Sequence, residues 1–581
     1  MKKLIIILLC LISFSANSQN KKGNTQSHKI DPTVEVNRDF EGKMMEITKG
    51  KLNTGGNDSL YNFKVGFNYS FFEKPYKDMY EFAPVASAKV PQLENTNRPE
   101  LIARVGMGYP LAPEAEILYS PELGNGNYLN LGGNFNLYKG DLPMLVVNTH
   151  TLEDWGKTVE NKEYKYGIGA EYTKAWKSGE FNLRGGFGGG YSTYYGKTEF
   201  PTTSGDPTNT TNSTETVLKS AESPYHTYNQ ANAGMGIKSS GAGKYGKKFN
   251  YSADLSFKHT TDKKEESLKE NLIGFHGEMG PTVGRYNKFM VGIDAQAVMY
   301  TGTTEYHYGI FGITPQYRFE NGNLKVNAGV KLQGKFTNAQ NEADKYHNVI
   351  FPAVDFSWGI APQKFWLYAM ATGWNNINAY SSLLERNNYI NPDTAPQELM
   401  ASSVPLNVEG GFKGRCTDKF SYNIYAGYSI HNGLLQFLHD MGEGWFDIIY
   451  TKNNEFYAGA QTDINTERFL GGISFKYSSF SQQVIGIPSL QSRVYAQYNW
   501  NKRVFITAEC NLYGEYNCYE DVNYYVKVPG FADLDAGVEY VFTPAISFWV
   551  KGKNLLNENT QYLPYYMGRR RGFVAGIIVK L

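Results

Sequence analysis

The sequence lacks long apolar runs. After residue 18 no stretch resembles a transmembrane helix, which needs roughly 20 apolar residues, and the mean hydropathy is −0.45. A helical membrane protein is therefore excluded. Cysteine is also scarce, because beyond the first 18 residues the chain carries only Cys416, Cys510 and Cys518. Three thiols cannot all pair, so disulfides are not the framework of the fold, although Cys510 and Cys518 are close enough in sequence to pair locally.

Strong net charge and catalytic clusters are absent as well. The formal net charge is +1 at pH 7, so no global field favours nucleic acid or strongly acidic partners. The nine histidines are scattered, without a carboxylate or cysteine at metal-ligand spacing on one strand face, and no serine has a supporting histidine. We predict a protein that is not an enzyme and that uses no cofactor, metal or nucleic acid.

The first 18 residues have the features of an export signal. Lys2 and Lys3 form a basic start, residues 4–12 form a short apolar core, and Ala16 and Ser18 occupy the small-residue positions that a signal peptidase reads. The apolar core is too short to span a bilayer as a helix. We predict cleavage after Ser18 and export of the chain.

Long alternating segments dominate the remaining sequence. Residues 248–259, 323–336 and 533–542 alternate strictly between apolar and polar side chains, which predicts β-strands. The chain also holds 60 glycines, and aromatic residues make up 15% of it. A long exported chain of this composition indicates many strands with aromatic girdles.

A transmembrane antiparallel β-barrel explains these strands better than a soluble sandwich does. Strands of soluble proteins usually have about 3–10 residues, whereas a tilted strand needs about 9–11 residues to cross a bilayer. Short connections also alternate with long ones, as outer-membrane barrels require. Counting from about residue 98 to residue 581 predicts an all-β barrel of about 22 strands, with 18–22 as the range. The predicted long connections are 196–223, 338–346, 376–402, 434–444, 515–529 and 557–569.

The last strand has an apolar face that includes the final residue. Its members are the odd-numbered residues Phe573, Ala575, Ile577, Val579 and Leu581. We predict that they face lipid in a closed barrel. A strand of this kind resembles the signal by which the barrel-assembly machinery recognises its clients, although that signal usually ends in an aromatic residue.

Two segments resemble the TonB-dependent receptors, whose barrels have 22 strands. Residues 531–581 are similar to the last three strands of that family, and Asn554-Leu555-Leu556-Asn557 matches its NLF(D/N) pattern. Residues 387–414 are similar to the family loop that carries an NP-x-L-x-P-E pattern. The resemblance implies the outer membrane of a Gram-negative bacterium of the Bacteroidota type, with lipid and lipopolysaccharide around the barrel.

The N-terminal part departs from that family. TonB-dependent receptors carry a plug of well over a hundred residues before the barrel, but only residues 19–97 are available here. Residues 63–90 are too rich in aromatics for a disordered tail. We therefore predict a short segment at the periplasmic base or in the lumen, without a full plug.

Charged residues give two further expectations. Inward positions on the predicted strands would line an aqueous lumen, and the candidates are Lys325, Lys331, Lys335, Asp535 and Glu539. Arg569, Arg570 and Arg571 lie where the final strand leaves the extracellular side. They form either a solvated rim or a contact with lipid A phosphates, which guanidinium groups bind well.

Two functions remain open, ahead of a surface enzyme or adhesin, which has only the long loops in its favour. In the first, the barrel transports solutes or passes material through a partner complex. In the second, it is a non-transporting scaffold in an outer-membrane assembly or surface-export complex, with lipoprotein or other barrel subunits as partners. An open lumen of this diameter is poorly tolerated by a cell. We therefore expect the N-terminal segment, inward-folded loops or a partner to obstruct it.

Overall fold

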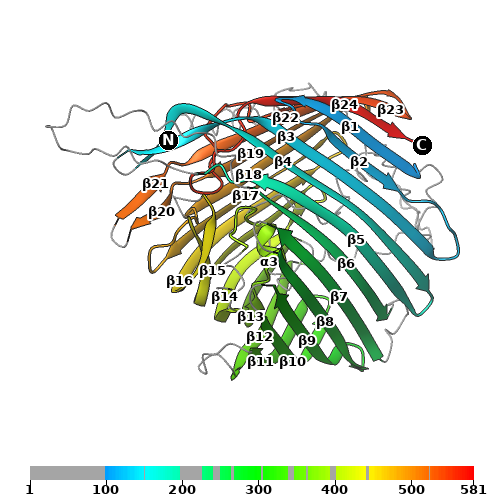
Figure 1. Ribbon diagram of the computed structural model, residues 1–581. Helices are drawn as coiled ribbons and strands as arrows, with labels where there is room; N and C mark the ends of the chain where they lie inside the picture. The colour runs from blue at the N-terminus through cyan, green and yellow to red at the C-terminus, as the bar shows by residue number, and fades with distance from the viewer. Residues whose placement is uncertain are drawn as a thin grey trace, which may run out of the picture. The chain divides into compact units, whose positions relative to one another are not determined.

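The computed structural model describes residues 99–581, apart from 149–150, 197–224, 240–248, 264–266, 303–304, 338–345, 362–363, 393–398, 400, 440–443 and 522–523. The predicted signal peptide (1–18) and the predicted short N-terminal segment (19–97) lie outside the described residues. Nearly all of the described chain is strand, and its elements are shown in Figure 1.

The strands follow one another along the chain, and the longest connections between them, 194–224, 378–400 and 554–571, all lie at one end of the strands. Their bounds are β1 (Leu101–Tyr109), β2 (Glu114–Tyr119), β3 (Asn127–Asn148), β4 (Thr151–Trp176), β5 (Gly179–Thr193), β6 (Tyr225–Ser239), β7 (Phe249–Lys263), β8 (Ser267–Val283), β9 (Asn287–Thr301), β10 (Tyr306–Asn321), β11 (Leu324–Thr337), β12 (Tyr346–Ala361), β13 (Phe365–Ile377), β14 (Ala401–Thr417), β15 (Phe420–His439), β16 (Phe446–Asn465), β17 (Phe469–Phe480), β18 (Leu490–Trp500), β19 (Val504–Tyr513), β20 (Tyr516–Asp521), β21 (Tyr524–Val528), β22 (Phe531–Thr543), β23 (Ile546–Lys553) and β24 (Gly572–Lys580).

These strands close into one antiparallel barrel. From β1 to β19 and from β22 to β24 each strand pairs with the next in sequence, and β1 pairs with β24 from Ile102 opposite Lys580 to Tyr109 opposite Phe573. Because β19 pairs directly with β22, the hairpin of β20 and β21 is not part of the ring, which therefore has 22 strands. The predicted fold and strand number are confirmed. Figure 1 shows β24 beside β1 at the seam.

The seam includes the last residue of the chain. The amide of Leu101 donates to the carbonyl oxygen of Leu581 at 3.0 Å, and the amide of Leu581 donates back to Leu101 at 2.8 Å. A membrane-spanning sheet needs this closure, because a strand edge in lipid leaves backbone groups without hydrogen-bond partners.

Alternation along each strand gives the wall two different faces. On β11 the apolar side chains point outward, and Val330, Leu332 and Phe336 are each more than 40% exposed. The polar residues between them, such as Lys331 and Gln333, point inward. The outer face is therefore apolar where it meets lipid, and the inner face is polar.

The wall differs in height around the ring. The tallest strands are β3 and β4, with 22 and 26 residues, whereas β23, β24, β1 and β2 have eight, nine, nine and six residues. Since about 9–11 residues cross a bilayer, the tall strands extend well past the membrane. The four short strands adjoin one another and form a low wall at the seam.

Two predicted connections contain strand. Residues 434–439 continue β15, and residues 516–521 and 524–528 form β20 and β21. The alternation there is broken because these segments lie beyond the lipid, where no apolar partner constrains the outward face.

The described residues contain one α-helix, α3 (Tyr380–Leu384), in the β13–β14 connection. No helix among them has the length and apolarity needed to cross a membrane.

The two faces of β11 make a direct test of the barrel. Replacing outward-facing Val330 by lysine should lower the free energy of unfolding by about 2–4 kcal/mol, because it puts a charge into the lipid near the middle of the strand. Asn327→Lys is the control, since Asn327 faces inward and donates to Asp355 at 3.3 Å. Denaturant unfolding of the protein in lipid vesicles measures both. Equal destabilisation by the two lysines would contradict the assigned faces.

Candidate functional site: a cap across the extracellular mouth

The longer connections mark one end of the barrel as extracellular, since outer-membrane barrels turn tightly at the periplasmic end. At this end four connections fold inward and pack on one another. We call them the cap, which consists of residues 194–196, 378–392 with Leu399, 444–446 and 554–571.

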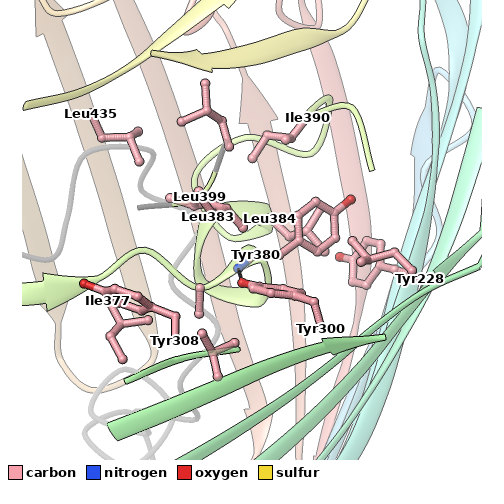
Figure 2. Packing of buried hydrophobic residues seen from close by; sticks show 14 of the residues in the cluster. Tyr228, Tyr300, Tyr308, Ile377, Tyr380, Leu383, Leu384, Ile390, Leu399 and Leu435 are labelled. Carbon is pink, nitrogen blue, oxygen red and sulfur yellow. Dashed lines mark hydrogen bonds between the residues drawn. The ribbon is translucent and has the colours of Figure 1, made fainter. Parts of the chain in front are cut away.

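The β13–β14 connection forms the centre of the cap. Tyr380, Leu383 and Leu384 of α3 are almost completely buried, and so is Ile390 after the helix. These side chains belong to one buried cluster with Tyr300 and Tyr308 of the wall, and Figure 2 shows Tyr380 beside Tyr300. Burial of this much apolar surface fixes the connection inside the ring of strands.

The cap joins opposite walls. Ile390 forms a parallel bridge with Phe446, and the amide of Phe446 donates to Tyr389 at 2.8 Å. From the other side, the hydroxyl of Tyr194 donates to the carbonyl oxygen of Ile390 at 3.2 Å. Tyr194 follows β5 and Phe446 begins β16, which are eleven strands apart in the ring of 22. The connection therefore crosses the whole mouth.

Tyrosines hold the four connections together. The rings of Tyr389 and Tyr566 stack with centroids 3.8 Å apart, and Tyr195 meets Tyr566 edge-on at 4.7 Å. The hydroxyl of Tyr195 donates to the carbonyl oxygen of Met567 at 2.8 Å, and that of Tyr566 donates to the carbonyl oxygen of Gly444. Each ring thus buries apolar area while its hydroxyl is satisfied.

A buried carboxylate on β7 holds α3 against the wall. Asp262 is fully buried and accepts a hydrogen bond of 2.7 Å from the hydroxyl of Tyr380. It also lies 2.9 Å from Nδ1 of His226, which is equally buried. Burial beside this carboxylate raises the pKa of Tyr380 well above its ordinary value, so its hydroxyl keeps its proton and donates.

A second buried carboxylate, on β8, holds the backbone of α3. Glu270 accepts from the hydroxyl of Tyr300 at 2.7 Å and from the amide of Ser381 at 3.2 Å. The amide of Tyr380 in turn donates to the hydroxyl oxygen of Tyr300 at 3.1 Å (Figure 2). We call the two carboxylates with these partners the latch. It consists of His226, Asp262, Glu270 and Tyr300 on the wall and of Tyr380 and Ser381 in the cap.

The five lumen candidates all alternate with lipid-facing residues and so lie on the inner side of the wall. Lys325 pairs with Glu320 at 2.7 Å. Asp535 pairs with Lys551 at 3.2 Å, and Glu539 pairs with Lys580 at 3.4 Å. Lys331 and Lys335 follow on the same face of β11. A role of these residues in passage of a solute stays a prediction.

The residues of the predicted assembly signal lie on the outer side of β24. Phe573, Ile577 and Leu581 are 54%, 39% and 67% exposed, whereas Val574 and Ile578 on the other side are buried. Ala575 and Val579 share the outer side with them. Recognition of this strand by the barrel-assembly machinery stays a prediction.

The three consecutive arginines do not point the same way. Arg569 turns inward, where its guanidinium lies 4.2 Å from the ring centre of Tyr138 and 3.7 Å from Glu163. Arg570 and Arg571 are exposed. A contact with lipid A therefore remains a prediction, and the placement favours Arg570 and Arg571 for it over Arg569.

Sequence reasoning missed the latch, although it singled out both segments that carry the family resemblance. Each of those segments contributes to the cap. Asn391 is buried and donates its amide to Phe446 at 3.1 Å, and Asn554 is buried at the start of the β23–β24 connection. The signal available in the sequence was a polar asparagine within each of the two motif segments.

Among the described residues no group of three or more histidine, cysteine, aspartate or glutamate side chains is placed to hold a metal ion.

Comparison with known proteins agrees on the fold. No protein-family model and no curated protein sequence matches the chain. Solved structures do match, including the iron transporter FrpB from Neisseria meningitidis, with 11% identity, a TM-score of 0.62, and 84% of this chain and 82% of that chain covered. The copper transporter OprC matches with 11% identity and a TM-score of 0.60, and the match covers 84% of this chain and 82% of that chain. The ferric-catecholate import receptor Fiu from E. coli K12 matches with 10% identity and a TM-score of 0.58, and the match covers 84% of this chain and 82% of that chain. The chain thus shares the barrel fold of these three structures.

The latch predicts how firmly the cap is held. Tyr380→Phe removes the hydroxyl that Asp262 accepts from and leaves that buried carboxylate short of a donor, which costs about 1–3 kcal/mol. Hydrogen exchange of the amides in 380–391 should become faster by roughly 5- to 150-fold. Tyr317→Phe is the control, because it removes a hydroxyl bonded to Asn287 at 2.6 Å near the periplasmic turns. Unchanged exchange in Tyr380→Phe, or an equal increase in the control, would show that the latch does not hold the cap.

Proposed function

We propose that this protein is a gated transport barrel of the outer membrane, in which polar solutes pass through the lumen when the cap moves aside. The observation that carries the proposal is the cap itself, which crosses the mouth and is fastened to the wall by buried polar groups. The transport function of the structurally similar barrels supports the same reading.

The lumen wall suits water and polar solutes. Inward-facing cations and anions form pairs between strands, among them Arg184 with Asp254 at 2.6 Å and Arg493 with Glu509 at 3.0 Å. These side chains are about 40–50% exposed, so they stay hydrated. Because both signs are present in pairs, the wall has no evident preference for cations or anions, and we propose a polar solute without strong net charge.

The composition of the latch indicates a cap that can open, and it argues against a permanent lid. Burying a carboxylate is costly even when it is hydrogen-bonded, and apolar residues of similar size often hold a structure more firmly. Asp262 and Glu270 are nevertheless both fully buried at the cap contact. We infer that they hold the cap reversibly, since each can be rehydrated when α3 leaves.

The second candidate is a scaffold that does not transport. The observation in its favour is the extent of the cap, whose four connections bury a continuous aromatic cluster around Tyr389, Phe446 and Tyr566. A barrel whose lumen is never used needs such a closure. We keep with this candidate the partners expected from the sequence, namely lipoprotein or other barrel subunits of an assembly or surface-export complex.

We also propose that residues 19–97 are a short segment at the periplasmic base or in the lumen, in place of a full plug. Their contribution to closure is separable from that of the cap, because β1, which follows them in the chain, begins at the end of the barrel opposite the cap.

Planar-bilayer conductance separates the two functions. The wild-type protein should be closed most of the time. A variant with Asp262→Ala and Glu270→Ala should open frequently, because the latch loses both acceptors for α3. Asp254→Ala is the matched control, since Asp254 pairs with Arg184 on the wall and is not part of the latch.

A further variant makes the test decisive. It combines the latch substitutions with removal of 19–97, so that neither end is closed by the chain itself. Retention of the barrel is checked by its resistance to unfolding in detergent at room temperature. A folded variant that still conducts nothing would rule out the transport proposal, and stable co-purification of other outer-membrane subunits would then favour the scaffold.

A further inference from the structure

The low wall at the seam ends near the membrane surface. Strand β1 stops at Tyr109, and residues 110–113 turn directly into β2, whereas the adjacent β3 continues to Asn148. At this position the barrel has no extended strands above the lipid. A molecule in the outer leaflet can therefore reach the inner rim over the seam.

Two aromatic residues mark the level of the lipid headgroups at this place. Tyr109 is 69% exposed and Phe573 is 54% exposed, and they face outward with stacked rings 6.2 Å apart. Aromatic girdles of outer-membrane barrels lie at the interface between hydrocarbon and headgroups. The top of β1 and the start of β24 are therefore at headgroup height.

A groove crosses the rim at the same place. Its lining includes the outward-facing Tyr109 and Phe573, the inward-facing Tyr138, Lys553 and Arg569, and the exposed Arg570. Lys553 follows outward-facing Val550 by three residues and so points inward. The groove thus has an apolar outer end and a basic inner end.

The groove is basic overall. Its one carboxylate, Glu114, lies 3.3 Å from Arg104 and is neutralised by it. The described residues include no carboxylate within ion-pair distance of Lys553. Arg569 pairs with Glu163 at 3.7 Å, and Lys553 and Arg570 add further positive charge to the groove at the headgroup level.

The Asn554–Asn557 turn holds the arginines in position. Asn554 adopts a left-handed backbone (φ 44°), and its side-chain amide donates to the carbonyl oxygens of Glu558 at 2.9 Å and Arg569 at 3.0 Å. The amide of Arg571 donates to the side-chain oxygen of Asn557 at 3.2 Å. The backbone on both sides of Arg570 is thereby fixed, so the position from which its side chain extends does not have to be ordered when a ligand binds.

We propose that this groove binds the phosphorylated headgroup of an outer-leaflet lipid. Lys553 and Arg570 contact the phosphate, and Arg569 with Tyr138 closes the inner end. The acyl chains remain outside, against Tyr109, Phe573 and the apolar outer face of the seam. Guanidinium and ammonium groups suit this ligand because they form charge-assisted hydrogen bonds with phosphate, and an amphiphile matches the two ends of the groove better than a soluble anion does.

Native mass spectrometry of the full-length protein in detergent tests the proposal. The probes are lipid A with both phosphates and the same lipid after enzymatic removal of phosphate. The variant carries Lys553→Gln and Arg570→Gln. The control carries Lys238→Gln and Arg285→Gln, which remove the same charge at the periplasmic end. We expect the variant to bind lipid A roughly tenfold more weakly or worse, and the control to bind it like wild type.

Three results would overturn the proposal. These are equal binding of the dephosphorylated lipid to wild type, unchanged binding of lipid A to the variant, and an equal loss of binding in the control. Binding of inorganic phosphate as tightly as lipid A would also overturn it, since the acyl chains would then contribute nothing and the ligand would be a soluble anion. The readout is lipid binding, so it is independent of whether the barrel conducts.

Discussion

Closure of the backbone at the seam is the constraint on which the rest of the structure depends. In lipid every amide and carbonyl needs a partner within the protein, and the pairing of β1 with β24 supplies the last of them. Once the ring is closed, alternation divides each strand between lipid and lumen. The cap then depends on the ring, because its connections start from strands that only closure brings to face one another.

The cap and the wall are stabilised by different physics. The wall is a continuous ladder of backbone hydrogen bonds, with paired charges on its inner face. The cap has little regular structure and is held by aromatic packing and by two buried carboxylates. A contact of that kind can be broken locally without disturbing the ladder, which is what a moving element on a fixed barrel requires.

Alternation was enough to predict the barrel, its strand number and the faces of its strands, because lipid on one side and water on the other impose a period of two. Inward-folded loops were predicted only as one of three possible obstructions, beside the N-terminal segment and a partner. Tyr194 and Ile390, like Tyr195 and Met567, are far apart in sequence, so no local pattern pairs them. Nothing in the sequence around His226, Asp262 and Glu270 distinguishes these residues from other polar residues on the strands. The Asn554–Asn557 motif was recognised by resemblance, but its hydrogen bonds to the arginine segment required the structure.

The unequal height of the wall gives the barrel a direction within the plane of the membrane. On the side of β3 and β4 the strands rise past the bilayer and keep neighbouring molecules at a distance. On the side of β23, β24, β1 and β2 a neighbour can approach until it touches the lipid-facing surface. In a crowded membrane such a molecule does not present the same profile to all its surroundings, and close lateral contacts are favoured along the arc where the rim is lowest.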